Sequence, residues 1–228
     1  MATARKAKAR TSASRAANDR DVAEWIRERI RRGRFVPGQR LVEADIIAQL
    51  GASRSKIREA LKRLEAEGLV TIEEFRGASV RRIGPSEVRA IYRTRMVLEG
   101  LAAAEFAAAD APKLKQRLLA LQREMDRWKQ EGGHERFATL NREWHELIIE
   151  GSHNPYLVEF LPRLTVPIYR LLFQSFYSDQ RIDAANADHQ AITTAIVEGR
   201  VDEAEQAMRR HIAGGLEGVS EIGAQFMD

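Results

Sequence analysis

The chain has 228 residues, 44% of them apolar, and no cysteine, which excludes a disulfide framework and a thiolate metal site. No stretch approaches the roughly 18 consecutive apolar residues that a membrane span needs, and the basic N-terminus lacks the apolar core of a secretion signal. We therefore expect a cytoplasmic protein that has no membrane partner.

The net charge of +4 is distributed unevenly along the chain. Residues 1–82 hold 20 Lys and Arg against 11 Asp and Glu, a net +9, so the remainder carries −5. Such an asymmetry indicates a basic N-terminal module that faces a polyanion and an acidic module with another task. The alternative is a solvated basic tail, because Arg5, Lys6 and Lys8 supply part of the excess.

The N-terminal segment begins with small and basic residues. Residues 1–17 have no periodic apolar pattern, so we expect them to form a disordered basic arm. Apolar residues at helical spacing follow and predict a first helix that is capped by Asn18 or Asp19 and ends near Gly33.

Two further helices and a hairpin are predicted next. A short helix is expected over residues 43–50, and Ser53 then caps a helix that runs to about Glu67, with Gly68 at its C-terminal end. Two short apolar runs around Ile72 and Val80, joined by a Gly-containing connection, predict a β-hairpin. Three helices followed by a hairpin predict a winged helix-turn-helix.

The rest of the chain is almost wholly helical in pattern. Ser86 is expected to cap the first of its helices, and Pro155 to stand at the first position of another. Pro162 and Pro167 should kink or break the segment that follows Pro155. Apolar spacing predicts the other helices over residues 87–109, 113–131, 135–150, 187–199 and 202–218.

The predicted fold class is therefore mainly α, with an N-terminal winged helix-turn-helix and a C-terminal antiparallel all-helical bundle. We expect a basic arm over residues 1–17, the winged helix-turn-helix over 18–83, and a helical effector-binding and dimerisation domain over 84–228.

Polar and basic residues gather at the start of the third helix. They are Ser53, Arg54, Ser55, Lys56 and Arg58. A recognition helix needs such an arrangement, because its first turns enter the major groove, where arginine can donate two hydrogen bonds to guanine while hydroxyls hold phosphate. The alternative is an ordinary capped helix whose charged side chains lie in water.

Three of the five histidines fall on helical stripes that point toward a core. Together with one amide they form a candidate set of Asn141, His145, His189 and His211. Three inward imidazoles from three helices can bind a divalent transition metal, with the amide oxygen and solvent completing the shell. The alternative is that each is a hydrogen-bonded core residue. His134 and His153 are predicted to lie in loops, and we leave both out of the site.

The N-terminal motifs resemble those of a known family. They are Pro37–Leu41, Gly51–Arg54, Arg58–Leu61, Arg63–Glu65, Glu67–Val70, and Gly77 with Val80. On these residues, the span from about Val22 to Val80 resembles the DNA-binding domain of the GntR family of bacterial regulators. The resemblance implies that Arg54 and Arg58 contact bases and phosphates, and that Ser53 and Ser55 bind the DNA backbone.

The same resemblance implies that the wing around Gly77 approaches the minor groove. Arg40 and Arg76 complete the set of candidate DNA contacts. This chain departs from the family pattern at two places. It has Ala44 where the second helix of the family often carries a basic residue, and Lys56 replaces a frequent proline. We expect its operator to differ from those of close relatives.

Residues from about 87 to 218 resemble the helical, FCD-like effector domain of the FadR-type branch of that family. The supporting motifs are Arg95–Glu99, Asn141–His145, Asn154–Pro155, His189–Ile192 and Arg210–His211. In metal-binding members an Asp four residues before the first His holds the ion with the three His, and Asn141 stands in that position here. The resemblance implies a divalent ion, Zn, Ni or Mn, and an effector site in which Arg95 pairs with a carboxylate.

The leading hypothesis is a metabolite-responsive repressor, not an enzyme, that binds double-stranded DNA with a palindromic operator as a homodimer. One alternative is a DNA-binding protein whose helical domain only dimerises, with the histidines as core residues. Another is a metal-dependent hydrolase fused to a DNA-binding module, although Glu143 and Glu146 would face away from His145 on a helix.

Overall fold

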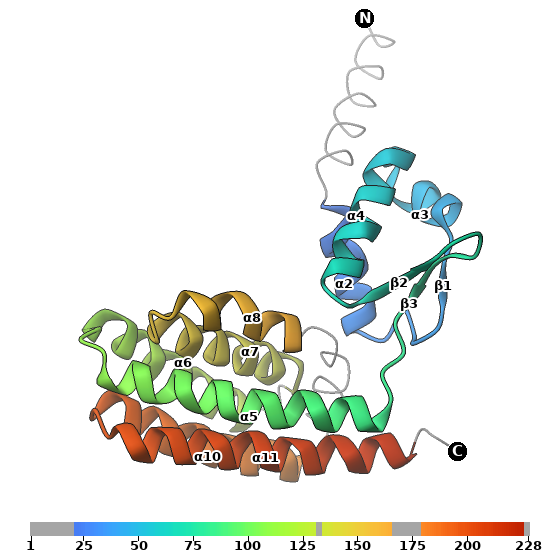
Figure 1. The fold of residues 1–228 in the computed structure, drawn as a ribbon. Coiled ribbons are helices and arrows are strands. Elements are labelled where there is room, and N and C mark those ends of the chain that lie inside the picture. Colours follow the sequence, from blue (N-terminus) through green and yellow to red (C-terminus); the bar gives the residue numbers. More distant parts are fainter. Residues whose placement is uncertain (1–20, 131–133, 166–178, 226–228) are drawn as a thin grey trace, which may run out of the picture. The chain divides into compact units, whose positions relative to one another are not determined.

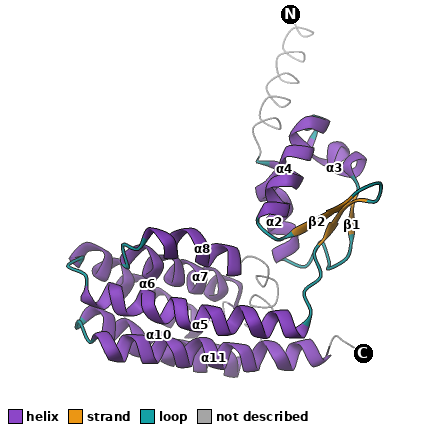
Figure 2. Cartoon of the chain, viewed as in Figure 1, coloured by secondary structure: helices purple, strands orange, loops and turns teal. Residues whose placement is uncertain are grey.

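The computed structural model describes residues 21–130, 134–165 and 179–225. The chain divides into two compact units, Met1–Arg82 and Ile83–Asp228. Helices dominate both units, and one small sheet lies in the first (Figures 1 and 2), so the predicted fold class is confirmed.

Three described helices form the N-terminal unit together with the sheet. They are α2 (Val22–Arg31), α3 (Glu43–Leu50) and α4 (Arg54–Ala66). The fully buried side chains of Ile26, Ile57 and Leu64 pack at its centre. The cap of α2 is Asp21, whose carboxylate accepts from the backbone of Ala23. The basic arm and the proposed caps Asn18 and Asp19 lie outside the described residues.

Helix α4 begins and ends as its sequence predicts. Ser53 is the N-cap, and its hydroxyl accepts from the backbone N–H of Lys56 at 3.4 Å. The apolar stripe is buried, and Gly68 adopts φ +77° just beyond the helix. A residue with a side chain would be strained in this left-handed conformation, which is why glycine follows the helix.

The sheet has one more strand than the sequence indicated. Strands β2 (Val70–Glu73) and β3 (Gly77–Val80) form the predicted antiparallel hairpin, in the register Val70 to Val80. Strand β1 (Arg40–Leu41) pairs with the other edge of β3, giving the order β1-β3-β2. Two residues are too few to show an alternating pattern, so the hairpin prediction lacked β1.

The helices of the C-terminal unit form a bundle with a continuous apolar core. They are α5 (Pro85–Ala108), α6 (Pro112–Gln130), α7 (His134–Gly151), α8 (Pro155–Thr165), α10 (Asp179–Val197) and α11 (Val201–Gln225). Helix α5 lies along α11, which also contacts α10, while α6 packs on α7 (Figure 1). Across the described residues, no helix is both long and apolar enough to cross a membrane.

Several boundaries in this unit differ from the predictions. The cap of α5 is Gly84, not Ser86, because Pro85 takes the first helical position with its preset φ. Helix α10 begins at Asp179, well before residue 187, and its early turns are too polar to show apolar spacing. Helix α8 starts at Pro155 as predicted and runs through Pro162 before ending at Thr165.

The predicted loop position of His134 is wrong, because this residue opens α7. Its Nε2 lies 2.7 Å from Asp179 Oδ1. His153 does lie in a turn, with φ +55°, between α7 and α8. Pro167 lies outside the described residues.

Candidate functional site

The candidate DNA contacts of α4 lie on its exposed first turns. The side chains of Arg54 and Arg58 are 68% and 63% exposed. The Ser53 hydroxyl caps the helix and lies 3.0 Å from the hydroxyl of Ser55. Lys56 follows on the same turn, so α4 presents all five predicted residues at one helix end.

A carboxylate on α3 holds the two arginines. Glu43 Oε1 accepts from Arg58 Nε at 2.9 Å, and Glu43 Oε2 lies 3.6 Å from Arg54 Nε. Both contacts use the Nε atom, which leaves the two Nη groups of each guanidinium as further donors. Nothing in the sequence pointed to Glu43, because no spacing rule links α3 to a side chain across the turn.

The remaining DNA candidates lie on the sheet. Arg40 stands on β1 opposite Ser79 of β3. Arg76, at the turn of the hairpin, forms an ion pair with Glu73 at 3.1 Å. Gly77 has φ +82°, and a Cβ on it would lie 3.8 Å from Arg40 Nη2. The Arg40 side chain therefore extends from the level of Ser79 toward the turn end of the hairpin.

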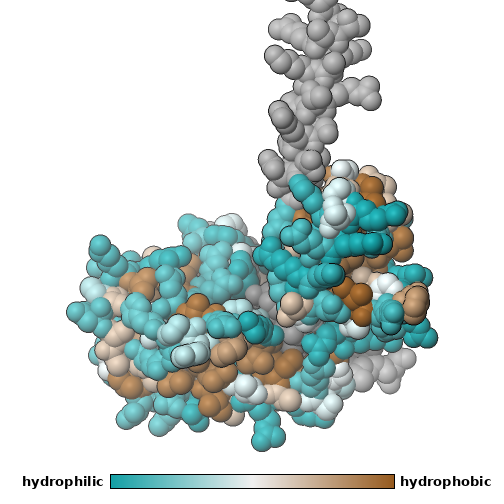
Figure 3. Space-filling model, turned by 45° about the horizontal axis from the view of Figure 1, so that its top comes forward, coloured by the Kyte–Doolittle hydropathy of each residue, from teal (hydrophilic) through white to brown (hydrophobic). Residues whose placement is uncertain are grey.

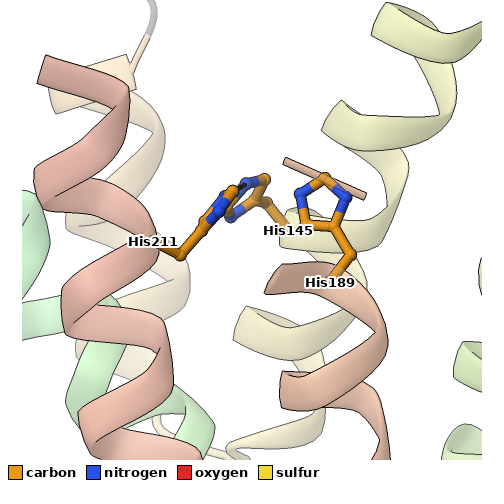
Figure 4. Close-up of side chains that lie close together, drawn as sticks. All are labelled: His145, His189 and His211. Carbon is orange, nitrogen blue, oxygen red and sulfur yellow. Dashed lines mark hydrogen bonds between the residues drawn. The ribbon is translucent and has the colours of Figure 1, made fainter. Parts of the chain in front are cut away.

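In the C-terminal unit, three helices bring His145, His189 and His211 together (Figure 4). One nitrogen of each ring lies within 4.8 Å of the others. His145 Nε2 and His211 Nε2 are 3.4 Å apart, and His189 is fully buried. The buried indole of Trp144 packs against this cluster, with its ring centroid 4.5 Å from that of His189. The rings thus converge in an interior site, not on the surface.

Two carboxylates hold the outer nitrogens of two of these rings. Glu99 Oε2 lies 2.7 Å from His145 Nδ1, and Asp188 Oδ2 lies 3.2 Å from His211 Nδ1. An ionised carboxylate can only accept, so each Nδ1 carries the proton and each Nε2 keeps its lone pair. Metal-binding histidines are commonly oriented by such carboxylates.

Burial and neighbouring charges set the protonation of the site. Burial alone would raise the pKa of Glu99, but Arg95 and His145 outweigh it and lower that pKa to about 2. Burial lowers the pKa of His145 more than Glu99 raises it. Burial also holds the pKa of His189 well below its usual range, with help from His211 and His145. His145 and His189 are therefore neutral near pH 7, as a metal ligand must be.

The buried polar atoms without partners fit a cation. Neither ring nitrogen of His189 has a hydrogen-bond partner, and the same is true of Asn141 Oδ1, although both residues are buried. A buried polar atom without a partner costs free energy, and a bound cation would satisfy Asn141 Oδ1 and the unprotonated nitrogen of His189. Asn141 and His145 are one helical turn apart on α7, so they share a face. The donor set of three imidazoles and an amide oxygen suits a divalent transition metal.

Arg95 lies next to this cluster. It is buried, and its Nε donates to Glu99 Oε1 at 2.7 Å, so one carboxylate joins Arg95 to His145. This ion pair lies within a single helix. The hydroxyl of Tyr92, one turn earlier, interacts with Arg95, and neither this hydroxyl nor Arg95 Nη1 makes a further hydrogen bond. Arg95 therefore lies between Glu99 and Tyr92 in the interior of the helical unit.

Three residues of this site were absent from the predicted set: Glu99, Asp188 and Trp144. A signal for Glu99 existed, since it lies one turn after Arg95 on the same helix face. Asp188 and Trp144 are direct neighbours in sequence of two ligand candidates, and sequence adjacency does not place side chains on one face.

Comparison with known proteins gives two family matches. The FCD domain matches residues 90–214, and the bacterial regulatory proteins of the gntR family match residues 18–80. Both agree with the resemblances found in the sequence.

Individual relatives match most of the chain. YieP, an uncharacterized HTH-type transcriptional regulator of Escherichia coli (strain K12), is 31% identical over 206 residues, which cover 82% of this chain and 88% of YieP. A probable D-xylose utilization operon transcriptional repressor of Paenarthrobacter nicotinovorans is 28% identical, over 86% of this chain and 85% of the repressor. The solved structure of Escherichia coli McbR/YncC has a TM-score of 0.77 at 20% identity, covering 88% of this chain and 96% of the other, and this likeness concerns the fold.

Proposed function

We propose a function from one premise: this chain belongs to the GntR family of bacterial regulatory proteins and carries an FCD domain. It is a DNA-binding transcriptional regulator, and its relatives are regulators rather than enzymes. The proposed activity is repression at a palindromic operator, relieved or reinforced by a small carboxylate that binds beside a metal ion in the FCD domain.

The observation that carries this proposal is the buried histidine cluster with unpartnered nitrogens. His145, His189 and His211, with Asn141, would hold one divalent ion, Zn, Ni or Mn. Such an ion, when bound, keeps open positions that a carboxylate can occupy. The residues of the chain supply the rest: Glu99 and Asp188 fix the ring tautomers, and Trp144 excludes water from one side.

The nature of the effector follows from Arg95. Its Nε is held by Glu99, which also holds His145, so the unpartnered Nη1 lies one carboxylate away from the metal donors. An anion that reaches the ion can also accept from this buried guanidinium in a charge-assisted hydrogen bond. A small carboxylate has the matching charge and geometry.

Operator binding is assigned to the start of α4 and to the wing. The proposed contacts are Arg40, Ser53, Arg54, Ser55, Lys56, Arg58, Arg76 and Gly77. A two-fold homodimer would present two such surfaces to a palindrome. Support for a dimer comes from the helical unit, whose visible face carries a band of hydrophobic residues (Figure 3) and whose helix α5 exposes Val97 and Leu101.

Elemental analysis of the purified full-length protein tests the metal site. After incubation with Zn²⁺, Mn²⁺ or Ni²⁺ and dialysis, we expect about one ion per chain, as a three-histidine site implies. His189→Ala should lose the ion while keeping its helical circular dichroism. His153→Asn is the matched control, because His153 lies in a turn with positive φ that Asn tolerates, and it should keep the ion. A wild type that takes up none of the three metals would contradict the proposed site.

A second measurement tests the switch. Operator affinity is compared for the chelated protein, the metal-loaded protein and the metal-loaded protein with a panel of small di- and tricarboxylates. A regulator requires different affinities of the effector for the DNA-bound and free states, so at least one addition should shift operator binding. Equal affinity under all conditions would leave a DNA-binding protein without the proposed switch.

A further inference from the structure

The tip of the wing carries an exposed aromatic side chain. Phe75 is 96% exposed, more than any other large apolar residue among those described. It lies between the last pair of the hairpin, Glu73 with Gly77, in the turn that joins β2 to β3. Figure 1 shows this hairpin extending beyond the helices of its unit, so its turn is free to meet a partner.

The backbone at Phe75 is as unusual as its exposure. Its φ is +62°, and His153 is the one other non-glycine residue with positive φ in the described ranges. This conformation is unfavourable for a bulky side chain and acceptable for Gly or Asn. Both the solvation and the backbone therefore disfavour phenylalanine here, and a strained residue that persists is a reason to look for a function.

The charges around the tip indicate which kind of contact it makes. Glu73 and Arg76 form an ion pair, and Glu74 stands beside Phe75 in the turn. The turn itself carries the carboxylates of Glu73 and Glu74 and the guanidinium of Arg76, so the tip of the wing has no excess positive charge with which to neutralise phosphates. What remains at its end is an uncharged ring, whose partner in DNA is the stack of bases.

We propose that Phe75 is an apolar wedge that enters the minor groove of the operator and partly unstacks one base step. The proposal rests on the DNA binding assigned above. It adds a contact whose contribution to affinity depends on how easily the DNA deforms, since pyrimidine–purine steps unstack most readily. Proteins that insert Phe, Leu or Ile between base steps bend the duplex in this way.

The experiment uses the full-length protein and the duplex that the wild type enriches most strongly from a library of random double-stranded DNA. Phe75→Asn removes the wedge and suits the positive φ, whereas Phe75→Leu keeps an apolar wedge. Thr71→Ala, an exposed position on the same hairpin, is the matched control. Binding is measured over a range of salt concentrations. Fluorescent 2-aminopurine, placed at one base step after another along that duplex, reports which step is unstacked.

We expect Phe75→Asn to bind on the order of tenfold more weakly, while Phe75→Leu and Thr71→Ala stay close to the wild type. The salt dependence of the Asn variant should be unchanged, because no phosphate contact is lost, and its Tm should be equal to or above that of the wild type. The 2-aminopurine signal of the wild-type complex should disappear with Phe75→Asn.

Equal binding by Phe75→Asn, or a drop in its Tm that accounts for weaker binding, would overturn the wedge while leaving DNA binding intact. A wild type that enriches no duplex at all would instead overturn the proposed operator binding, and the wedge with it. The two failures are thus distinguished by the wild type alone.

Discussion

Glu99 joins Arg95 to the histidine cluster of the helical unit through a single buried carboxylate. One oxygen accepts from Arg95 and the other from His145 Nδ1, both at 2.7 Å. The low pKa of Glu99 keeps it ionised, so the proton on His145 stays on Nδ1 and the lone pair of Nε2 faces the other rings. Asp188 repeats this arrangement at His211.

These carboxylates should therefore tune metal affinity without touching the ion. Glu99→Gln and Asp188→Asn are each expected to weaken metal binding by about 10- to 100-fold, because the orienting acceptor is lost. Competition with a chromophoric chelator measures the change. Glu124→Gln, which alters an exposed ion pair with Arg136, is the control and should bind metal normally. Asp188 is 49% exposed, so its variant separates orientation from the folding defect that a buried change at Glu99 can cause. Unchanged affinity in both variants would refute the role of the carboxylates.

Local spacing predicted the histidines of the candidate site but not the groups that orient them. The spacing of Asn141 and His145, and the apolar stripes around His189 and His211, follow from local helix geometry. The pairing of Glu99 with His145 joins residues 46 positions apart on different helices, and that of His211 with Asp188 spans 23 positions. Such contacts depend on how the helices pack, which periodicity does not specify.

At the scale of elements, the contact between α7 and α5 depends on the absence of a side chain. A Cβ on Gly151, the last residue of α7, would overlap the fully buried ring of Phe106 on α5. Gly214 in α11, by contrast, has nothing within 4 Å of its Cβ position. The two glycines therefore differ in what surrounds them, and Gly151 ends its helix whereas Gly214 lies inside one.

Alanine at these two positions should change stability in opposite directions. Gly151→Ala is expected to lower the free energy of unfolding by about 1–3 kcal/mol through overpacking. Gly214→Ala should raise it by up to about 1 kcal/mol, since alanine is the better helix former. Urea unfolding followed by circular dichroism measures both. If Gly151→Ala is as stable as the wild type, the packing of Phe106 described here is wrong.

Elements with strong apolar spacing were predictable almost to the residue, as α3 and α4 show. The others lacked a local signal. Strand β1 is two residues long and is held by its pairing with β3. The start of α10 is polar, and its buried Asn186 bonds to Gln122 and Asp126 of α6, a tertiary network that hydropathy does not reveal.

For the whole molecule, the buried histidines link stability to pH. The pKa of His189 is lower in the folded chain than its usual value of 6.5, because burial disfavours the charged ring. Below pH 6.5, His189 therefore binds a proton in the unfolded chain but stays neutral in the folded chain. Stability is full above that pH and falls as the pH drops, by up to about 1.4 kcal/mol per pH unit for each such histidine.

Urea unfolding of the chelated protein at pH 7.5, 6.5 and 5.5 tests this expectation. The wild type should lose stability over that range, and His189→Leu should lose less, because the variant has one buried ring fewer to protonate. Equal pH dependence in the two proteins would show that His189 accepts a proton in the folded state.

The ion pairs of Glu43 have a consequence for how the protein searches a chromosome. The carboxylate lies beside the guanidinium groups of Arg54 and Arg58, which are the proposed DNA contacts. Because both contacts use Nε, the Nη groups can still donate to bases, while the negative charge of Glu43 weakens the attraction of this helix end for phosphates on any DNA. Roughly 10⁶–10⁹ competing sites surround one operator in a genome. A carboxylate that weakens phosphate contacts but spares base contacts shortens the lifetime of each non-specific complex, and so shortens the search for the operator.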